Sequence, residues 1–332
     1  PSRPSRQWLI SKMFLSMFFL REKQVGMIYI THRLDEVMEM ADSVCAMRDG
    51  CYAGGGDIDH YTLRGLVELI VGESLRDDQR QALPGKDAPV LLKMDNVKVG
   101  DTGPVSFELR AGEMVALAGL RGAGQEEIGR LLFACRTQES GQITLNGVPF
   151  TATTPGEAMS AGVSFVAGDR LHESLIPGMM VRENLFMNPC KHGHAPLSRY
   201  NEKSEAPMSW EKIRQFDVRP AQINIEISAL SGGNQQKVVM ARWLSLNAPL
   251  LILEDPSAGV DVGARAEIYD LLNQALQNGV AILVISNDLE EVAHICNRAL
   301  VFNHGQIVGE LLNQDVTFAR LLELASGSGT LH

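Results

Sequence analysis

Cysteine is scarce in this sequence, and no two cysteines are spaced as a metal-binding or redox pair. The five cysteines are scattered and form no Cys-x-x-Cys motif. Such a set argues against a disulfide framework and a zinc site, and it favours a reducing compartment. Each is predicted to be a small buried apolar side chain. They are Cys45, Cys51, Cys135, Cys190 and Cys296.

Long apolar runs and an excess of positive charge are also missing. The most apolar N-terminal run, residues 8–20, contains Ser11, Lys12 and Ser16 and is shorter than the ~20 residues that span a bilayer. It also lacks the small-residue cleavage site of a signal peptide. With 30 basic and 40 acidic residues and no lysine-arginine block, the chain is not predicted to bind nucleic acid.

An internal repeat gives the clearest information about organisation. Residues 25–50 align without gaps with residues 280–305, at a constant offset of 255. Both copies have a β-rich apolar run, a polar pair, a Leu-x-Glu-Val motif on an amphipathic helix, a second strand and a turn glycine. We therefore expect a duplicated unit.

The two copies differ in what precedes them. Residues 90–279 precede the second copy within its own domain, whereas only residues 1–24 precede the first. Residues 1–24 do not resemble what should precede the repeat and are predicted to be unrelated or junction sequence. The remaining boundaries are predicted as a first-domain remnant over 25–75, a polar, proline-containing linker over 76–89, and a second domain over 90–332.

From residue 90 onward, short apolar runs alternate with amphipathic helices, a pattern typical of an α/β domain with a largely parallel sheet. Runs 250–253 and 280–285 are apolar on both faces, as central strands would be. A helix after Gly263 is predicted to end at Asn278 and Gly279, with one apolar stripe. The predicted strands are 114–118, 142–145, 162–166, 250–253 and 280–285.

A glycine-rich loop follows the first of these strands. Gly119, Gly122 and Gly124 are spaced so that backbone N–H groups can converge on phosphate oxygens at a helix N-terminus. The complete phosphate-loop pattern continues with Lys and then Ser or Thr, but here Gln125 and Glu126 follow. Without that lysine, no side-chain cation meets the β- and γ-phosphates, and without the hydroxyl the metal loses a ligand. A plain strand-to-helix turn that needs glycines is the alternative reading.

A second motif, Leu-Ser-Gly-Gly-Asn-Gln-Gln-Lys over 230–237, opens another helix. Ser231, Gly232 and Gly233 present a hydroxyl and backbone N–H groups at that helix N-terminus, which can also hold a phosphate. The alternative is a plain helix cap at Ser231. Together with Glu254-Asp255-Pro256 and the Gly-Val-Asp-Val-Gly stretch of 259–263, this motif resembles the ABC transporter ATPases.

More narrowly, the sequence resembles the second half of the tandem ATP-binding subunits of ribose, galactoside and xylose importers. The resemblance implies an α/β fold: a P-loop NTPase-like ABC nucleotide-binding domain with a mixed, mainly parallel sheet and a helical subdomain. It also implies ATP and Mg2+ as cofactors. In that family two nucleotide-binding domains hold each ATP between the phosphate loop of one and the signature motif of the other.

The resemblance assigns roles residue by residue. The implied nucleotide contacts are Gly119, Arg121, Gly122, Ala123, Gly124, Gln125 and Glu126 in the phosphate loop, and Ser231, Gly232, Gly233 and Gln235 in the signature. Asp261 matches the acidic residue that contacts the opposite domain. The implied catalytic positions are Glu254, Asp255, His32 and Asn287, with His32 as the γ-phosphate switch and Glu254 as a candidate Mg2+ ligand.

This chain departs from the family pattern at several of these positions. The family strand ends in Asp-Glu, whereas here the order is Glu254-Asp255, and adjacent strand residues point to opposite faces. Asn287 replaces the switch histidine, and Gly168 replaces a polar residue that contacts metal and water. We therefore expect the second domain's own site to be nearly inert. Family members often keep one such degenerate site.

The family function would be to couple ATP binding and hydrolysis to sugar uptake. The implied partners are membrane permease subunits, a second nucleotide-binding domain and, indirectly, a periplasmic sugar-binding protein, which places the chain peripherally on the cytoplasmic face of the inner membrane. The alternatives are a non-catalytic nucleotide-binding or permease-docking fragment, and a broken-gene product without a transport role. The sequence does not identify the sugar.

Overall fold

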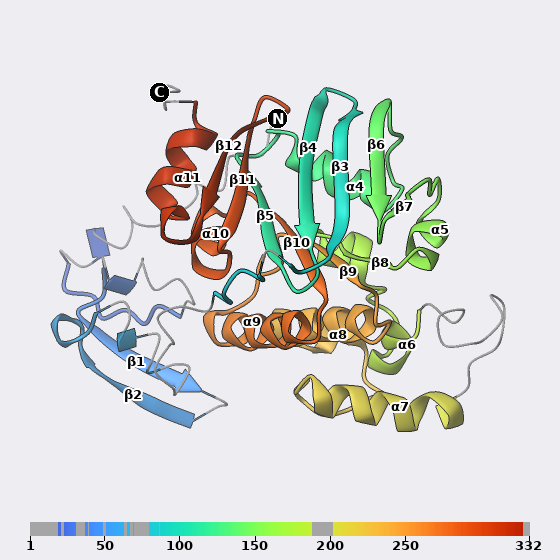
Figure 1. Ribbon diagram of the computed structural model, residues 1–332. Coiled ribbons are helices and arrows are strands. Elements are labelled where there is room, and N and C mark those ends of the chain that lie inside the picture. The colour runs from blue at the N-terminus through green and yellow to red at the C-terminus, as the bar shows by residue number, and fades with distance from the viewer. Residues whose placement is uncertain are drawn as a thin grey trace, which may run out of the picture. The chain divides into compact units, whose positions relative to one another are not determined.

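A computed structural model describes residues 19–20, 23–30, 37–38, 40–48, 51–62, 65–66, 69, 80–85, 87–187 and 202–327 (Figure 1). The chain divides into two compact units, Pro1–Gly72 and Glu73–His332. The predicted domain boundaries at 24, 75 and 89 remain predictions.

The first unit contains an antiparallel hairpin. Strand β1 (Ser43–Arg48) pairs with β2 (Cys51–Asp57), and a short 3-10 helix, Ile58–His60, follows. The apolar run of residues 25–30, which the repeat led us to expect as a strand, forms no strand here, and Ile28 is 95% exposed. Its counterpart in the second unit lies between two parallel neighbours, whereas no strand among the described residues pairs with residues 25–30.

The main sheet of the second unit has six strands in the order β12-β11-β5-β10-β9-β8. All neighbouring pairs are parallel except β11 with β12. The strands are β5 (Met114–Gly119), β8 (Val163–Val166), β9 (Leu250–Glu254), β10 (Ala281–Ser286), β11 (Arg298–Asn303) and β12 (Gln306–Leu312). The mainly parallel sheet predicted from the sequence is confirmed.

Burial explains which of these strands lie inside the sheet. Every residue of β5, β9 and β10 is buried, so both faces of each strand are covered. Continuous apolar runs of this kind form the interior of a parallel sheet, because an edge or a half-exposed strand would leave one face in water. Strands β9 and β10 accordingly lie inside the sheet, as their sequences predicted.

A second, antiparallel sheet has the order β4-β3-β6-β7. Its strands are β3 (Val90–Val99), β4 (Thr102–Arg110), β6 (Ser140–Leu145) and β7 (Val148–Pro149). Helix α4 (Gln125–Leu132) contacts strands of both sheets. Its stripe of Ile128, Leu131 and Leu132 is buried, as the i, i+3, i+4 spacing predicted.

The remaining helices of the second unit pack around the sheets or, as for the one over residues 202–215, against other helices (Figure 1). They are α5 (Pro155–Ser160), α6 (Val181–Leu185), α7 (Glu202–Gln215), α8 (Gly232–Leu244), α9 (Val262–Gln277), α10 (Leu289–Ile295) and α11 (Phe318–Ala325). Helices α6, α7 and α8 contact one another and form the predicted helical part. Helix α9 ends with Asn278 as its C-cap and Gly279 at φ +84°, as predicted.

Among the described cysteines, only part of the burial prediction holds. Cys296 is buried, whereas Cys45 and Cys135 are exposed. Cys45 lies on the two-stranded hairpin of the first unit, and Cys135 follows the end of α4, where the chain leaves the core. Among the described residues, no helix is both long and apolar enough to cross a bilayer.

Candidate nucleotide-binding site

The loop between β5 and α4 has the backbone that its glycines predicted. Gly122 and Gly124 have φ values of +81° and +104°, in the left-handed region that favours glycine. A Cβ on Gly124 would lie 2.4 Å from Thr102 Oγ1 and 3.0 Å from Gly305 Cα. The loop therefore needs glycine both for its conformation and for its close approach to neighbouring segments.

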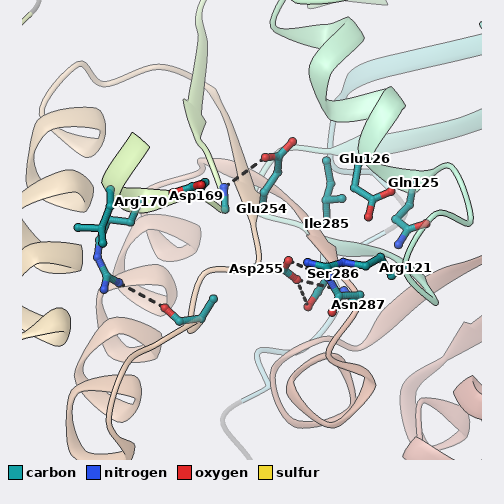
Figure 2. A pocket seen from close by; sticks show the side chains of 13 residues that line it. Arg121, Gln125, Glu126, Asp169, Arg170, Glu254, Asp255, Ile285, Ser286 and Asn287 are labelled. Carbon is teal, nitrogen blue, oxygen red and sulfur yellow. Dashed lines mark hydrogen bonds between the residues drawn. The ribbon is translucent and has the colours of Figure 1, made fainter. Parts of the chain in front are cut away.

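A cavity of about 460 Å³ opens beside this loop (Figure 2). Its lining comes from the carboxyl ends of β8, β9 and β10 and from the start of α4, because parallel strands bring those ends to one edge of the sheet. Six predicted site residues line it: Arg121, Gln125, Glu126, Glu254, Asp255 and Asn287. Gly168, which the sequence analysis singled out as a departure, lines it as well.

Gln125 folds back onto its own loop. Its side-chain amide Nε2 donates hydrogen bonds to the carbonyl oxygens of Gly119 at 3.1 Å and Leu120 at 3.3 Å. The residue is fully buried, and its Oε1 has no hydrogen-bond partner. A buried amide oxygen without a donor carries a desolvation cost of about 1–3 kcal/mol. Gln125 thus closes the loop from within and places no positive charge in it.

Glu254, at the end of β9, is paired with an arginine from α4. Arg130 Nε donates to Glu254 Oε1 at 2.9 Å and Arg130 Nη2 donates to Oε2 at 2.8 Å. The backbone N–H of Gly168 also donates to Oε2, at 3.2 Å. Figure 2 shows the Glu254 carboxylate turned away from Asp255, as expected for neighbours at the end of a strand.

Arg130 pairs with two carboxylates at once. Its Nη1 and Nη2 atoms also donate to Glu173, at 3.0 and 2.6 Å. Its hydrogen bonds to Glu173 and Glu254 raise the pKa of Arg130 above its usual value. Burial raises the pKa of Glu254, and the contact with Arg130 opposes that rise. The result is a fork-shaped, bidentate arrangement at the wall of the cavity.

Asp255 is held by the chain that follows β10. Its Oδ1 accepts hydrogen bonds from Ser286 Oγ at 3.0 Å and from the Asn287 N–H at 3.1 Å, and its Oδ2 accepts from Asn287 Nδ2 at 2.9 Å. Asp255 has a φ of +39°, an unusual conformation that its short polar side chain tolerates. Both carboxylate oxygens are therefore occupied by donors from one neighbouring segment.

Behind Asp255 lies a buried carboxyl, the glutamate of the repeated Leu-x-Glu-Val motif, to which the sequence analysis gave no chemical role. Ser286 Oγ bridges Asp255 and Glu291 Oε2, at 3.2 Å from the latter, and Tyr269 Oη donates to Glu291 Oε1, also at 3.2 Å. Burial raises the pKa of Glu291 to about 7, although a hydrogen bond from Ser257 opposes the rise. This network connects the cavity wall to helices α9 and α10.

The second motif opens α8 but does not line the cavity. Ser231 is the N-cap of α8 and accepts from the Asn234 N–H and from Asn234 Nδ2, at 3.5 and 2.9 Å. Gln235 is buried and donates to the carbonyls of Ile227 and Leu230. The polar side chains after Ser231 thus hold the preceding segment in place.

Arg170 connects the cavity with this motif. It lines the cavity, and its Nε donates to Gln235 Oε1 at 3.3 Å while its Nη1 donates to the carbonyl of Ala258, also at 3.3 Å. Asp261 caps α9 by accepting from the Ala264 N–H at 3.0 Å. A Cβ on Gly233 would lie 2.3 Å from the Ala264 Cβ. The motif and the start of α9 are therefore tightly packed.

Comparison with known proteins identifies this arrangement. The ABC transporter family profile matches residues 102–258. A ribose import ATP-binding protein, RbsA 2 of Burkholderia pseudomallei (strain 1710b), is 35% identical over 335 residues, which covers 99% of this chain and 65% of that protein. The corresponding Clostridium perfringens (strain 13 / Type A) protein is 36% identical over 93% of this chain and 62% of its own length. Residues 102–258 thus form a domain of the ABC transporter family.

The chain is also 33% identical to a putative ribose/galactose/methyl galactoside import ATP-binding protein of Rhizobium etli (strain ATCC 51251 / DSM 11541 / JCM 21823 / NBRC 15573 / CFN 42). This alignment covers 96% of the chain and 60% of that relative. The chain thus spans 60–65% of the length of these relatives. That residues 1–24 are unrelated or junction sequence stays a prediction.

Solved structures agree on the fold of the ABC cassette. A nucleotide-free ATP-binding cassette from an ABC transporter aligns with a TM-score of 0.60 at 21% identity, covering 72% of this chain and 96% of that one. A dimeric cassette bound to ADP and Pi aligns with a TM-score of 0.57 at 20% identity, covering 67% and 98%. The predicted fold class is confirmed.

The predicted site residues fall into two groups in this ABC cassette. Gly119, Gly122, Ala123 and Gly124 shape the loop whose other members line the cavity. The signature group does not line it; these residues are Ser231, Gly232, Gly233, Gln235 and Asp261. His32 lies outside the described residues.

Sequence analysis missed Arg130, and it left Ser286 and Arg170 without a role. Arg130 lies on α4 outside its apolar stripe, and its partner Glu254 is 124 positions away. A polar residue at the end of a buried strand is the one local signal that Ser286 gives. These contacts depend on which helix packs on which strand, so no local pattern reveals them.

Proposed function

We propose that this chain is an ATP-binding component of an ABC sugar importer that couples ATP binding and hydrolysis to carbohydrate uptake through a membrane permease. The relatives with ribose or galactoside import in their names support this proposal. Its partners would be permease subunits and a second nucleotide-binding domain, with a periplasmic sugar-binding protein acting on the permease. It would work at the cytoplasmic face of the inner membrane and would not bind nucleic acid.

The separation of the two motifs is the observation that best supports this proposal. The phosphate loop borders the cavity, whereas Ser231, Gly232 and Gly233 do not line it. A cassette built in this way has half of the phosphate donors for one ATP and the complementary half for another. A shared site with a second nucleotide-binding domain would use both halves.

We expect the cavity itself to be impaired in hydrolysis. Gln125 supplies no cation, Asp255 is held by Ser286 and Asn287, and Asn287 cannot take or give a proton as histidine does. Turnover would then belong to the other composite site, where a complete phosphate loop, ATP with Mg2+ and the switch residue His32 meet the signature of this chain. Glu254 stays a candidate Mg2+ ligand only by family position.

The inward-folded Gln125 and the occupied Asp255 favour one alternative, a non-catalytic nucleotide-binding or permease-docking role. A broken-gene product without a transport role is the remaining alternative. A non-catalytic fragment would bind nucleotide or the permease without hydrolysing ATP. A non-functional product would show neither ATP hydrolysis nor permease binding.

Steady-state ATP hydrolysis by the purified chain, alone and with the first nucleotide-binding domain of a ribose import relative, tests the proposal. The chain alone should show negligible turnover, and addition of the partner domain should restore it. The same mixture with Ser231→Arg should stay inactive, because a bulky cation would block the signature. Brisk hydrolysis by the chain without a companion would contradict the proposal.

A further inference from the structure

As metal ligands, the carboxylate oxygens of the cavity do not suit the divalent ion that the family uses. Glu254 accepts three N–H hydrogen bonds, two from Arg130 and one from Gly168. An ionised carboxylate has about four acceptor positions, so one remains. Mg2+ demands near-ideal octahedral oxygen geometry at short range, and a guanidinium already bonded to the same carboxylate repels it.

The other acidic residues do not replace this ligand. Both oxygens of Asp255 accept from Ser286 and Asn287. Asp169, which also lines the cavity, accepts from the N–H and the ring of His172. Glu126 stands where the family has a hydroxyl, yet no group of three or more His, Cys, Asp or Glu residues in the described part of the chain could hold a metal ion.

Positive charge in this cavity instead comes from side chains. Arg121 and Arg170 line it, and Arg130 stands directly behind Glu254. In Figure 2 the Arg121 side chain extends toward Asn287, on the side of the cavity opposite to Arg170. Arg130 is held by two carboxylates in a four-bond arrangement, which fixes its guanidinium. An ion pair of this kind, partly buried, is not displaced without leaving Glu254 uncompensated.

We propose that this cavity takes its nucleotide without Mg2+, because the guanidinium of Arg130 holds Glu254, the carboxylate on which the family's metal depends. This inference rests on the proposed nucleotide-binding function. It concerns only the site in this second unit and leaves Mg2+ in the composite site that uses a complete phosphate loop. Arg130 is a positioning residue here, since it acts through Glu254.

The first experiment measures ATP binding to the full chain by isothermal titration calorimetry, in 5 mM Mg2+ and in excess EDTA. The two dissociation constants should agree within about twofold. A tenfold or greater tightening by Mg2+ would overturn the inference. Absence of binding in both buffers would count against the proposed function, and the metal question would then be decided by the second experiment.

The second experiment needs no nucleotide. Electron paramagnetic resonance of free Mn2+ reports how much of the ion the chain binds. At about 0.1 mM Mn2+, wild type should show no ion bound in the cavity. Arg130→Gln should bind Mn2+ at least about fivefold more tightly than wild type, and the double variant Arg130→Gln with Glu254→Gln should lose this gain. Tight Mn2+ binding by wild type that Glu254→Gln removes would overturn the inference.

Arg136→Gln is the matched control. Arg136 also makes a paired contact with a carboxylate, from Nε to Glu127 at 2.7 Å, but the pair is exposed and outside the cavity lining. This variant should leave Mn2+ binding unchanged. Far-ultraviolet circular dichroism checks that each variant folds, and if Arg130→Gln does not fold, the two wild-type measurements decide the question.

Discussion

Gln125 illustrates how one side chain changes a phosphate loop without changing its backbone. The glycines set the loop conformation, while the amide of Gln125 hydrogen-bonds the carbonyls of Gly119 and Leu120 and carries no charge. A lysine at this position would extend toward bound phosphates and supply a cation. The fold of the loop is thus retained, and the electrostatic part of its function is missing.

The double substitution Gln125→Lys with Glu126→Thr should restore that part. A cation and a hydroxyl replace an amide and a carboxylate, so we expect ATP affinity to rise at least tenfold, about 1.4 kcal/mol. Calorimetric titration with ATP measures the change. Glu127→Gln, on the same helix and paired only with exposed Arg136, is the control and should leave affinity within twofold. Equal affinity of the double variant and wild type would contradict this prediction.

Glu291 should make stability depend on pH. Because burial raises its pKa to about 7 in the folded chain, the folded state binds a proton more tightly than the unfolded state. Its contribution to stability is fully present below the ordinary glutamate pKa and is lost as pH rises through about 7. The free energy of unfolding should fall by roughly 2 kcal/mol between pH 5.5 and pH 8 from this group.

Urea unfolding of wild type and Glu291→Gln at those two pH values measures this effect. The amide cannot ionise, so the variant should lose most of the difference between the two pH values. An identical fall in both proteins would show that another group causes it.

Helices α8 and α9 illustrate capping at the scale of elements. Ser231 and Asp261 each precede a helix and accept a hydrogen bond from the N–H three residues later. Cap residues satisfy backbone donors that the helix itself leaves free. The two caps therefore fix the starts of the helices that carry the signature motif and the segment packed against it.

Asp261→Ala should destabilise the fold by about 1 kcal/mol, since it removes the cap of α9 and leaves the Ala264 N–H without its side-chain partner. Chemical denaturation measures the loss. Asp270→Ala is the matched control, because Asp270 is exposed in the middle of the same helix. That change should stay within about 0.5 kcal/mol. Equal effects of the two substitutions would refute the capping role.

At the scale of the molecule, the second unit has a hydrophobic core of its own. Its buried apolar cluster begins at Leu91, ends at Ala325 and joins both sheets through α4. Among the described residues of the first unit, the buried apolar side chains are Ala46, Ile58 and Leu66. A hairpin with so little buried surface gains little stability by itself.

A fragment that starts at Glu73 should therefore fold independently. We expect a cooperative thermal transition, followed by far-ultraviolet circular dichroism, within about 3 °C of that of the main transition of the full chain. The fragment retains Gln81, whose carbonyl accepts from Asn297 Nδ2 at 2.6 Å. A non-cooperative melt, or a large drop in the transition temperature, would show that the core depends on residues before Glu73.

The sequence by itself determined the parallel strands, the glycine loop between β5 and α4 and the end of α9. Apolar runs, glycines and cap residues act on the backbone within a few positions, so they can be read locally. The strand expected over 25–30 failed because a strand also needs partners. That requirement is not local.

Only the tertiary structure decided which hydrogen bonds and ion pairs hold the side chains around the cavity. The pairing of Arg130 with Glu254 spans 124 positions, and the chain of Asp255, Ser286 and Glu291 joins two strand ends to a helix. Such contacts arise when parallel strands bring their carboxyl ends to one edge and a helix from elsewhere packs beside them. Sequence named the carboxylates, and packing determined which donors hold them.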